Sequence, residues 1–290
     1  MDNKETIFQK SAVICNINIP CWTGVKKLPE MDAKFKRDHG IDADGEISTT
    51  YVKLMGSSHD LIKEIKSKGK EARRVHERFI VCRLGARGDN VVNFLTLGKI
   101  HKALEPYRDD VMGRVEDFCN SYEQLKQDAL AELNGVVPED FFPSVEEVRS
   151  KFGFELDIRS IPTSNILDNK LGNKEAEEEI RTSTAKALEK TMNESIKNVF
   201  DRFIIQIKNI NTQSKGVKGI ADSSLDNFAN FLSILPELNI FNDKTIEKAY
   251  EDAKQLLKYD AEQTKDQSVK DELADKSQSI LDDLNQFYGG

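Results

Sequence analysis

A run of apolar residues between positions 97 and 129 is the clearest pattern in the chain. These residues recur every three or four positions, close to a heptad repeat, and so predict one long helix with a narrow apolar seam. The seam consists of Leu97, Ile100, Leu104, Tyr107, Val111, Val115, Phe118, Tyr122, Leu125 and Ala129. Pro106 is expected in the first turn of this helix. Gly135, with Pro138 just beyond it, is expected to end the helix.

Residues 173–210 predict a second long helix, which would extend about 50 Å or more at ~1.5 Å per residue. Its apolar positions are Ile180, Thr184, Leu188, Met192, Ile196, Val199, Phe203, Ile207 and Ile210. Two helices of this size, each with a narrow apolar stripe, predict an antiparallel coiled-coil hairpin. A heptad seam suits a homo-oligomer equally well, and short-range pattern does not choose between the two.

Short strands are predicted between these helices. Alternating apolar residues at 11–19, an apolar run at 80–82 and alternation at 152–158 are typical of strands. A helix is expected over 58–78, and a short one after Ser144, with Glu147 completing a capping box. Residues 29–50 are expected to form a loop. The fold class is therefore mainly α with a small β-sheet at one end of the hairpin.

A polar segment at 213–219, containing glycine and lysine, predicts a domain boundary. It would separate residues 1–212, with the strands and the helical hairpin, from an acidic helical region at 220–290. Three helices are expected there, at about 222–234, 243–258 and 267–287. Their apolar residues suffice for a small bundle or for packing onto the main body.

Charge is distributed unevenly along the chain. The net charge is −8, and residues 222–290 carry 15 acidic against 7 basic residues, so the remainder is balanced. An acidic region disfavours non-specific nucleic-acid binding and favours solubility or a basic partner. No stretch approaches the ~20 apolar residues of a membrane span, and the N-terminus has no apolar signal core. We therefore expect a cytoplasmic protein with four free thiols, because the cysteines form no C-x-x-C pair.

The sequence offers no constellation for catalysis. The four histidines are scattered, which disfavours a metal site, and there is no G-x-S-x-G elbow. The turn at 85–88 lacks the lysine of a phosphate-binding P-loop. Paired carboxylates on charged helices are usually solvated. We therefore predict that the chain is not an enzyme and holds no metal or cofactor.

One basic cluster has the character of a binding site. The helix predicted at 58–78 carries more cations than its three glutamates, Glu64, Glu71 and Glu77, can balance. These cations form the candidate binding site. It consists of Lys63, Lys66, Lys70, Arg73, Arg74 and Arg78, with Lys68 in the same helix. Such a face could bind a nucleic-acid backbone or an acidic partner, and pairing with the chain's own acidic region is an equal alternative.

Two segments carry a resemblance to a known family. They are Trp22-Thr23-Gly24 with Lys26-Lys27-Leu28, and the Phe-Pro-Ser-Val-Glu-Glu-Val-Arg-Ser-Lys-Phe-Gly-Phe run at 142–154. Together with the order of elements over 11–210, they resemble a phage and bacterial family of unknown function, often encoded beside MoxR-type AAA ATPases and von Willebrand factor A-type proteins. The resemblance implies a phage or prophage origin, the cytoplasm of a bacterial host and cooperation with an ATPase. It carries over no catalytic residue.

Two classes of function follow from these features. The first is a non-enzymatic interaction protein that binds a protein partner through helical surfaces, either as an adaptor for an AAA ATPase or as an inhibitor of a host defence complex. The alternative is a nucleic-acid-binding accessory protein in recombination or repair, which would use the basic helix.

Overall fold

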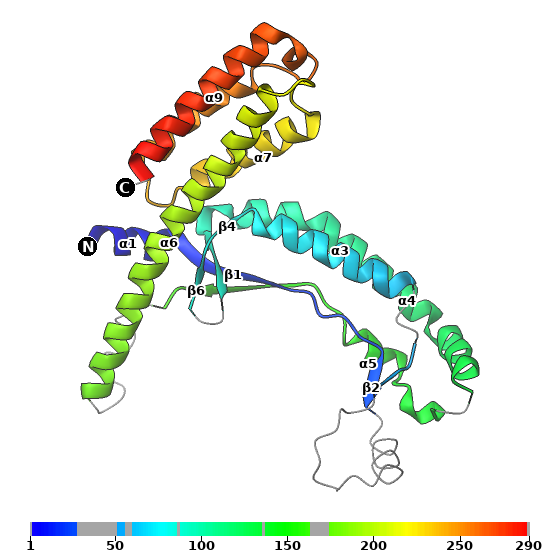
Figure 1. Cartoon of the computed structure of the whole chain (residues 1–290). Coiled ribbons are helices and arrows are strands. Elements are labelled where there is room, and N and C mark those ends of the chain that lie inside the picture. Colours follow the sequence, from blue (N-terminus) through cyan, green and yellow to red (C-terminus); the bar gives the residue numbers. More distant parts are fainter. Residues whose placement is uncertain are drawn as a thin grey trace, which may run out of the picture. The chain divides into compact units, whose positions relative to one another are not determined.

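The computed structural model describes residues 2–27, 51–55, 60–85, 88–134, 137–162 and 174–288. The chain divides into two compact units (Figure 1). Unit 1 consists of residues 1–16, 76–101 and 157–290, and unit 2 consists of residues 17–75 and 102–156. Neither unit is a continuous stretch of sequence. The boundary predicted at 213–219 stays a prediction; the structure places the turn between two helices of unit 1 there.

A four-stranded sheet, mostly in unit 1, has the order β4-β5-β1-β6. Its strands are β1 (Ala12–Asn18), β4 (Ile80–Leu84), β5 (Asp89–Asn93) and β6 (Glu155–Ser160). β5 pairs antiparallel with β1 and with β4. The turn between β4 and β5 uses Gly85 and Gly88 at positive φ, which glycine adopts without strain. The strands predicted at 11–19 and 80–82 are confirmed, and β5 was not predicted.

The helices of unit 1 form a bundle around one long helix. They are α1 (Asp2–Ser11), α6 (Lys174–Ser214), α7 (Asp222–Leu238), α8 (Lys244–Lys254) and α9 (Gln267–Tyr288), with short 3-10 helices at Gln255–Leu257 and Gln263–Lys265. α6 packs against α9, α7 and β4. Phe203, Ile207 and Phe228 are completely buried in this bundle. The acidic C-terminal helices therefore pack against the second long helix.

Unit 2 is built on two helices that run side by side, α3 (Asp60–Glu77) and α4 (Leu97–Leu133) (Figure 1). The first residues of α4 and the last of α3 belong to unit 1. Unit 2 also contains α5 (Val145–Arg149), the 3-10 helix Glu139–Phe141 and the paired strands β2 (Val25–Lys27) and β3 (Tyr51–Lys53). The 3-10 helix Phe94–Thr96, just before α4, belongs to unit 1. All ten seam residues predicted in α4 are buried or half-buried, which confirms the amphipathic pattern.

An aromatic cluster forms the core of unit 2. The Phe118 ring centroid lies 6.0 Å from that of Trp22, 6.1 Å from that of Tyr122 and 5.9 Å from that of Phe152. The Tyr122 hydroxyl donates a hydrogen bond to the carbonyl of Pro143. This bond ties α4 to the segment that leads into α5. There the predicted capping box of Ser144 and Glu147 is confirmed.

Several expectations are corrected. Pro106 lies inside α4, nine residues after its start, at an exposed position where water can hydrate the carbonyl freed by the missing N–H. The predicted fold class, mainly α with a small β-sheet, is confirmed. The coiled-coil hairpin stays a prediction, since most of α4 belongs to unit 2 and α6 belongs to unit 1. Ile158 and Ile180, expected on buried faces, are 42% and 41% exposed. The loop expected at 29–50 lies outside the described residues.

Candidate binding surface

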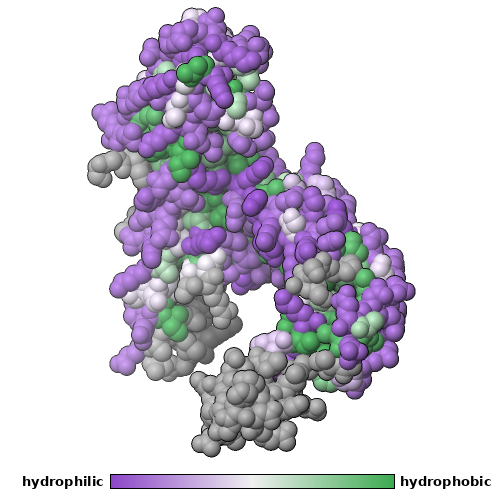
Figure 2. Space-filling model, turned by 45° about the vertical axis from the view of Figure 1, so that its right-hand side comes forward, coloured by the Kyte–Doolittle hydropathy of each residue, from purple (hydrophilic) through white to green (hydrophobic). Residues whose placement is uncertain are grey.

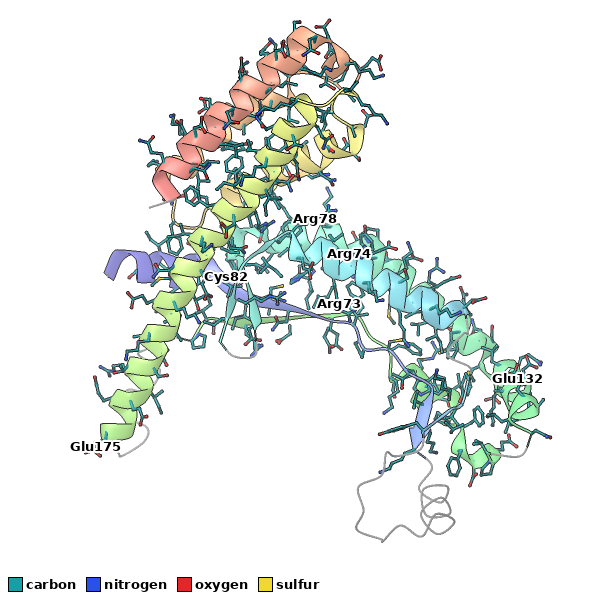
Figure 3. The ribbon with its side chains drawn as sticks, viewed as in Figure 1. Arg73, Arg74, Arg78, Cys82, Glu132 and Glu175 are labelled. Atoms are coloured by element: carbon teal, nitrogen blue, oxygen red, sulfur yellow. The ribbon has the colours of Figure 1, made fainter. Side chains whose placement is uncertain are left out.

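α3 separates its charges between two sides. Residues three or four apart lie on one face of a helix, and the cations of α3 follow this spacing. We call the side formed by Lys63, Lys66, Lys70, Arg73 and Arg74 the basic face of α3; all five side chains are exposed. Figure 3 labels two of them, Arg73 and Arg74. Figure 2 shows that hydrophilic residues cover most of the surface in view. The basic face lies entirely in unit 2.

Ion pairs with α4 hold the acidic side of α3. Glu64 pairs with Arg114 of α4, and Arg114 also pairs with Asp110 on its own helix. Lys68 Nζ lies 3.1 Å from a Glu71 carboxylate oxygen and 3.7 Å from one of Asp110. Glu64 and Glu71 are thus occupied by ion pairs. Glu77, three residues after Arg74, lies at the C-terminal end of the basic face and is exposed.

Three cations of the basic face have no ion pair among the residues that the structure describes: Lys66, Lys70 and Arg74. Lys63 Nζ lies 3.6 Å from Oδ1 of Asp60 in an exposed ion pair. Such a pair contributes little to stability in water. Arg73 differs, because its Nη2 donates a 3.0 Å hydrogen bond to the carbonyl of Ile19. Arg73 therefore positions the segment after β1, whereas Lys66, Lys70 and Arg74 remain free to bind an anion.

The remaining members of the predicted cluster behave differently. Arg78 follows the end of α3, belongs to unit 1 and lines a groove there with Arg202. The alternative that the basic face pairs with the chain's own acidic C-terminal helices stays open, because those helices belong to unit 1.

The cysteines are packing residues. All four are free, and Cys15, Cys82 and Cys119 are buried, as the sequence indicated. Burial raises the pKa of the Cys15 thiol to about 11 and that of Cys82 to about 12. Both thiols are therefore protonated at neutral pH and are weak nucleophiles. Among the residues described, no group of three or more His, Cys, Asp and Glu side chains is placed to hold a metal ion.

His76 is a buried titratable group. It is 1% exposed, its Nε2 atom has no hydrogen-bond partner within the described chain, and the ring bonds to the backbone of Cys15 through its other nitrogen. Burial lowers the pKa of His76, and the Cys15 carbonyl and the charge of Glu77 oppose that shift. The folded protein therefore favours the neutral ring.

We expect His76 to make the protein less stable in mild acid. Because its folded pKa lies below the unfolded value of about 6.5, its contribution is complete above that pH and is lost as the pH falls toward the folded pKa. The loss between pH 7.5 and 5.5 should reach up to about 1.4 kcal/mol. Urea unfolding of the wild type and of His76→Asn, which keeps a donor for Cys15 but does not titrate, measures it. An identical pH dependence in both proteins would contradict this assignment.

Comparisons with known proteins complete this description. No family model matches the chain, and neither a curated protein nor a solved structure is similar to it. The resemblance to a phage family stays a prediction. Within the described residues, no helix is both long enough and apolar enough to cross a membrane.

Proposed function

We propose that this chain is a non-enzymatic interaction protein whose basic face of α3 binds an acidic segment of a protein partner. The separation of charge on α3 supports this proposal most directly. Glu64 is paired with α4, whereas Lys66, Lys70 and Arg74 are exposed without a carboxylate partner in the described structure. A row of unpaired cations on a rigid helix gives an anionic partner both charge complementarity and register.

An acidic protein fits this face better than a nucleic acid does. From Lys63 to Arg74 the face extends only about 16 Å at ~1.5 Å per residue, and α3 contains no Phe, Tyr or Trp on which a base could stack. Unit 2 also carries 22 acidic against 18 basic residues, which weakens long-range attraction of a polyanion. Nucleic-acid binding is the alternative outcome of the test below.

The resemblance described above suggests the partner's class. A MoxR-type AAA ATPase would make this chain an adaptor, and a host defence protein would make it an inhibitor. Both roles need only an exposed helical surface and no catalytic group. The partner's identity is therefore the part of the proposal that a capture experiment must supply.

Charge reversal of the basic face tests the proposal. We expect Lys66→Glu, Lys70→Glu and Arg74→Glu together to reduce recovery of the partner at least tenfold, about 1.4 kcal/mol. Recovery is measured by quantitative mass spectrometry after capture of the tagged chain from its native cell, with and without nuclease. The control variant reverses three exposed lysines outside the face, Lys102, Lys151 and Lys208, and should keep the partner.

Each outcome is decisive. A nuclease-resistant partner that is lost only from the basic-face variant supports the proposal. Equal recovery by both variants overturns it, because the face would then make no contact. Loss of every partner on nuclease treatment also overturns it, and assigns the face to nucleic acid.

A further inference from the structure

A groove lies between α6 and α7 in unit 1. Its volume is about 280 Å³, just below the ~300–1,000 Å³ typical of small-molecule sites. Both helices contribute side chains three or four residues apart, which share one helix face, and Arg78 adds a cation. The polar lining residues central to the site are Arg78, Arg202, Gln206, Asn209, Asn227 and Asn230. Ile210, Phe231 and Ile234 supply its apolar part.

Arg202 is a cation without a counter-charge. Its Nη1 donates to the carbonyl of Ile80 at 2.9 Å and its Nη2 to the carbonyl of Arg78 at 2.7 Å. Its guanidinium carbon lies 5.6 Å from the centroid of the Phe231 ring. No carboxylate in the described structure pairs with it, and desolvation alone lowers its pKa. An incoming anion would therefore supply a charge that the fold leaves uncompensated.

Arg202 also keeps hydrogen-bonding capacity. A guanidinium has five N–H donors, and the two carbonyls account for two of them. Arg78, labelled in Figure 3, adds a second cation to the lining of this groove. Its side chain is exposed, and its backbone carbonyl accepts a hydrogen bond from Arg202. Two guanidinium groups sharing one site can hold a carboxylate through several charge-assisted hydrogen bonds.

Carboxamides line both walls of the groove. Gln206 and Asn209 come from α6 and Asn227 from α7, and none of their side chains makes a hydrogen bond to another described residue. Each carboxamide offers a donor and an acceptor together, as a peptide group does. Carboxamides on facing helices can therefore bond to the main chain of an extended segment whatever its side chains are.

We propose that this groove binds an acidic peptide segment in extended conformation, with its carboxylate at Arg78 and Arg202 and its main chain between the carboxamides. A free phosphate would use the arginines but would leave the carboxamides and the apolar residues without a role. The site shares no residue with the basic face of α3. It therefore does not rest on the function proposed above.

Two peptide pools test the groove. The probes are fluorescein-labelled random octapeptides, identical except for Asp at the fifth position in one pool and Asn in the other. Fluorescence polarisation with the full chain should show at least fivefold tighter binding of the Asp pool. Arg78→Ala with Asn227→Ala should remove that preference. The matched control, Lys208→Ala with Asn285→Ala, changes one exposed cation and one exposed amide outside the groove and should keep it.

Arg202 is left unchanged in these variants because its bonds to two backbone carbonyls are structural. Equal binding of the two pools, or an unchanged preference in the groove variant, overturns the proposal. A third outcome also overturns the proposal. If neither octapeptide pool binds, and millimolar inorganic phosphate displaces a labelled phosphopeptide, the groove is a phosphate site. Circular dichroism of each variant checks that the fold is retained.

Discussion

Replacing Phe118 by alanine is expected to lower the free energy of unfolding by about 3–5 kcal/mol. Phe118 is completely buried, and its ring contacts those of Trp22, Tyr122 and Phe152. Truncation removes the apolar area of the ring and leaves a cavity, because three aromatic neighbours fixed on different segments cannot all collapse into the space. The aromatic contacts add about 0.5–1.5 kcal/mol per pair beyond burial.

The chain contains its own reporter for this experiment. Trp22 is the only tryptophan, and it lies in the same cluster, so urea unfolding followed by tryptophan fluorescence reports on unit 2. Met112→Ala is the matched control, because Met112 lies on the same helix and is 40% exposed. We expect that control to change the unfolding free energy by only about 0.5 kcal/mol. Similar effects of the two substitutions would show that the aromatic cluster does not carry the core of unit 2.

Replacing Gly219 by alanine is expected to lower the free energy of unfolding by about 2–5 kcal/mol. Gly219 has a φ of 78°, where a Cβ atom costs roughly 1–2 kcal/mol. The new Cβ would also lie 2.8 Å from the carbonyl oxygen of Thr264. That oxygen belongs to backbone, and the Thr264 hydroxyl beside it accepts the N–H of Ile220 at 2.9 Å. Relieving the clash must therefore disturb the contact between the segment before α7 and the turn before α9. We expect this disturbance to lower the free energy of unfolding by about 1–3 kcal/mol.

Gly85→Ala separates the two contributions. Gly85 has a similar φ of 68°, but no atom lies within 4 Å of its expected Cβ. Its substitution should therefore cost only the backbone component, about 1–2 kcal/mol. Chemical denaturation followed by circular dichroism measures both variants. If Gly219→Ala costs no more than Gly85→Ala, the contact with Thr264 is relieved freely and this prediction is wrong.

The sequence predicted local structure well because local structure depends on neighbours along the chain. The seam of α4 and the capping box at Ser144 are patterns of three- and four-residue spacing, and both are confirmed. β5 was missed because its apolar content is only Val91 and Val92, both completely buried. Burial between β1 and β4 makes those two residues sufficient, and that depends on residues far away in the sequence.

The cover of the apolar stripe on α6 was missed for the same physical reason. An apolar stripe shows that a face must be covered, but it does not identify what covers it. Phe203 and Ile207 of α6, two residues of the predicted stripe, are buried in a bundle with helices that come later in the chain. The C-terminal helices were predicted as elements, but not as the cover of this stripe.

The sequence predicted one of the two candidate sites and missed the other. The basic cluster on α3 is visible in the sequence. The ion pair that occupies Glu64 is not, because its partner Arg114 lies fifty residues away along the chain. The groove was missed. Its carboxamides do recur at three-residue spacing, as Gln206 with Asn209 and Asn227 with Asn230. The surroundings of Arg202, however, depend on the packing of α6 against β4. This packing gives Arg202 two backbone carbonyls as partners and no carboxylate.

The interleaving of the two units has a consequence for synthesis on the ribosome. The chain changes unit after residues 16, 75, 101 and 156, so β1 emerges well before β5, the strand that pairs with it. All of unit 2 has been translated by residue 156, while the part of unit 1 that contains α6 to α9 is still to come. A nascent chain must therefore keep the apolar face of β4, against which α6 packs, from aggregating until α6 arrives. Gene fragments cut at either unit's edges would also break a strand or a helix.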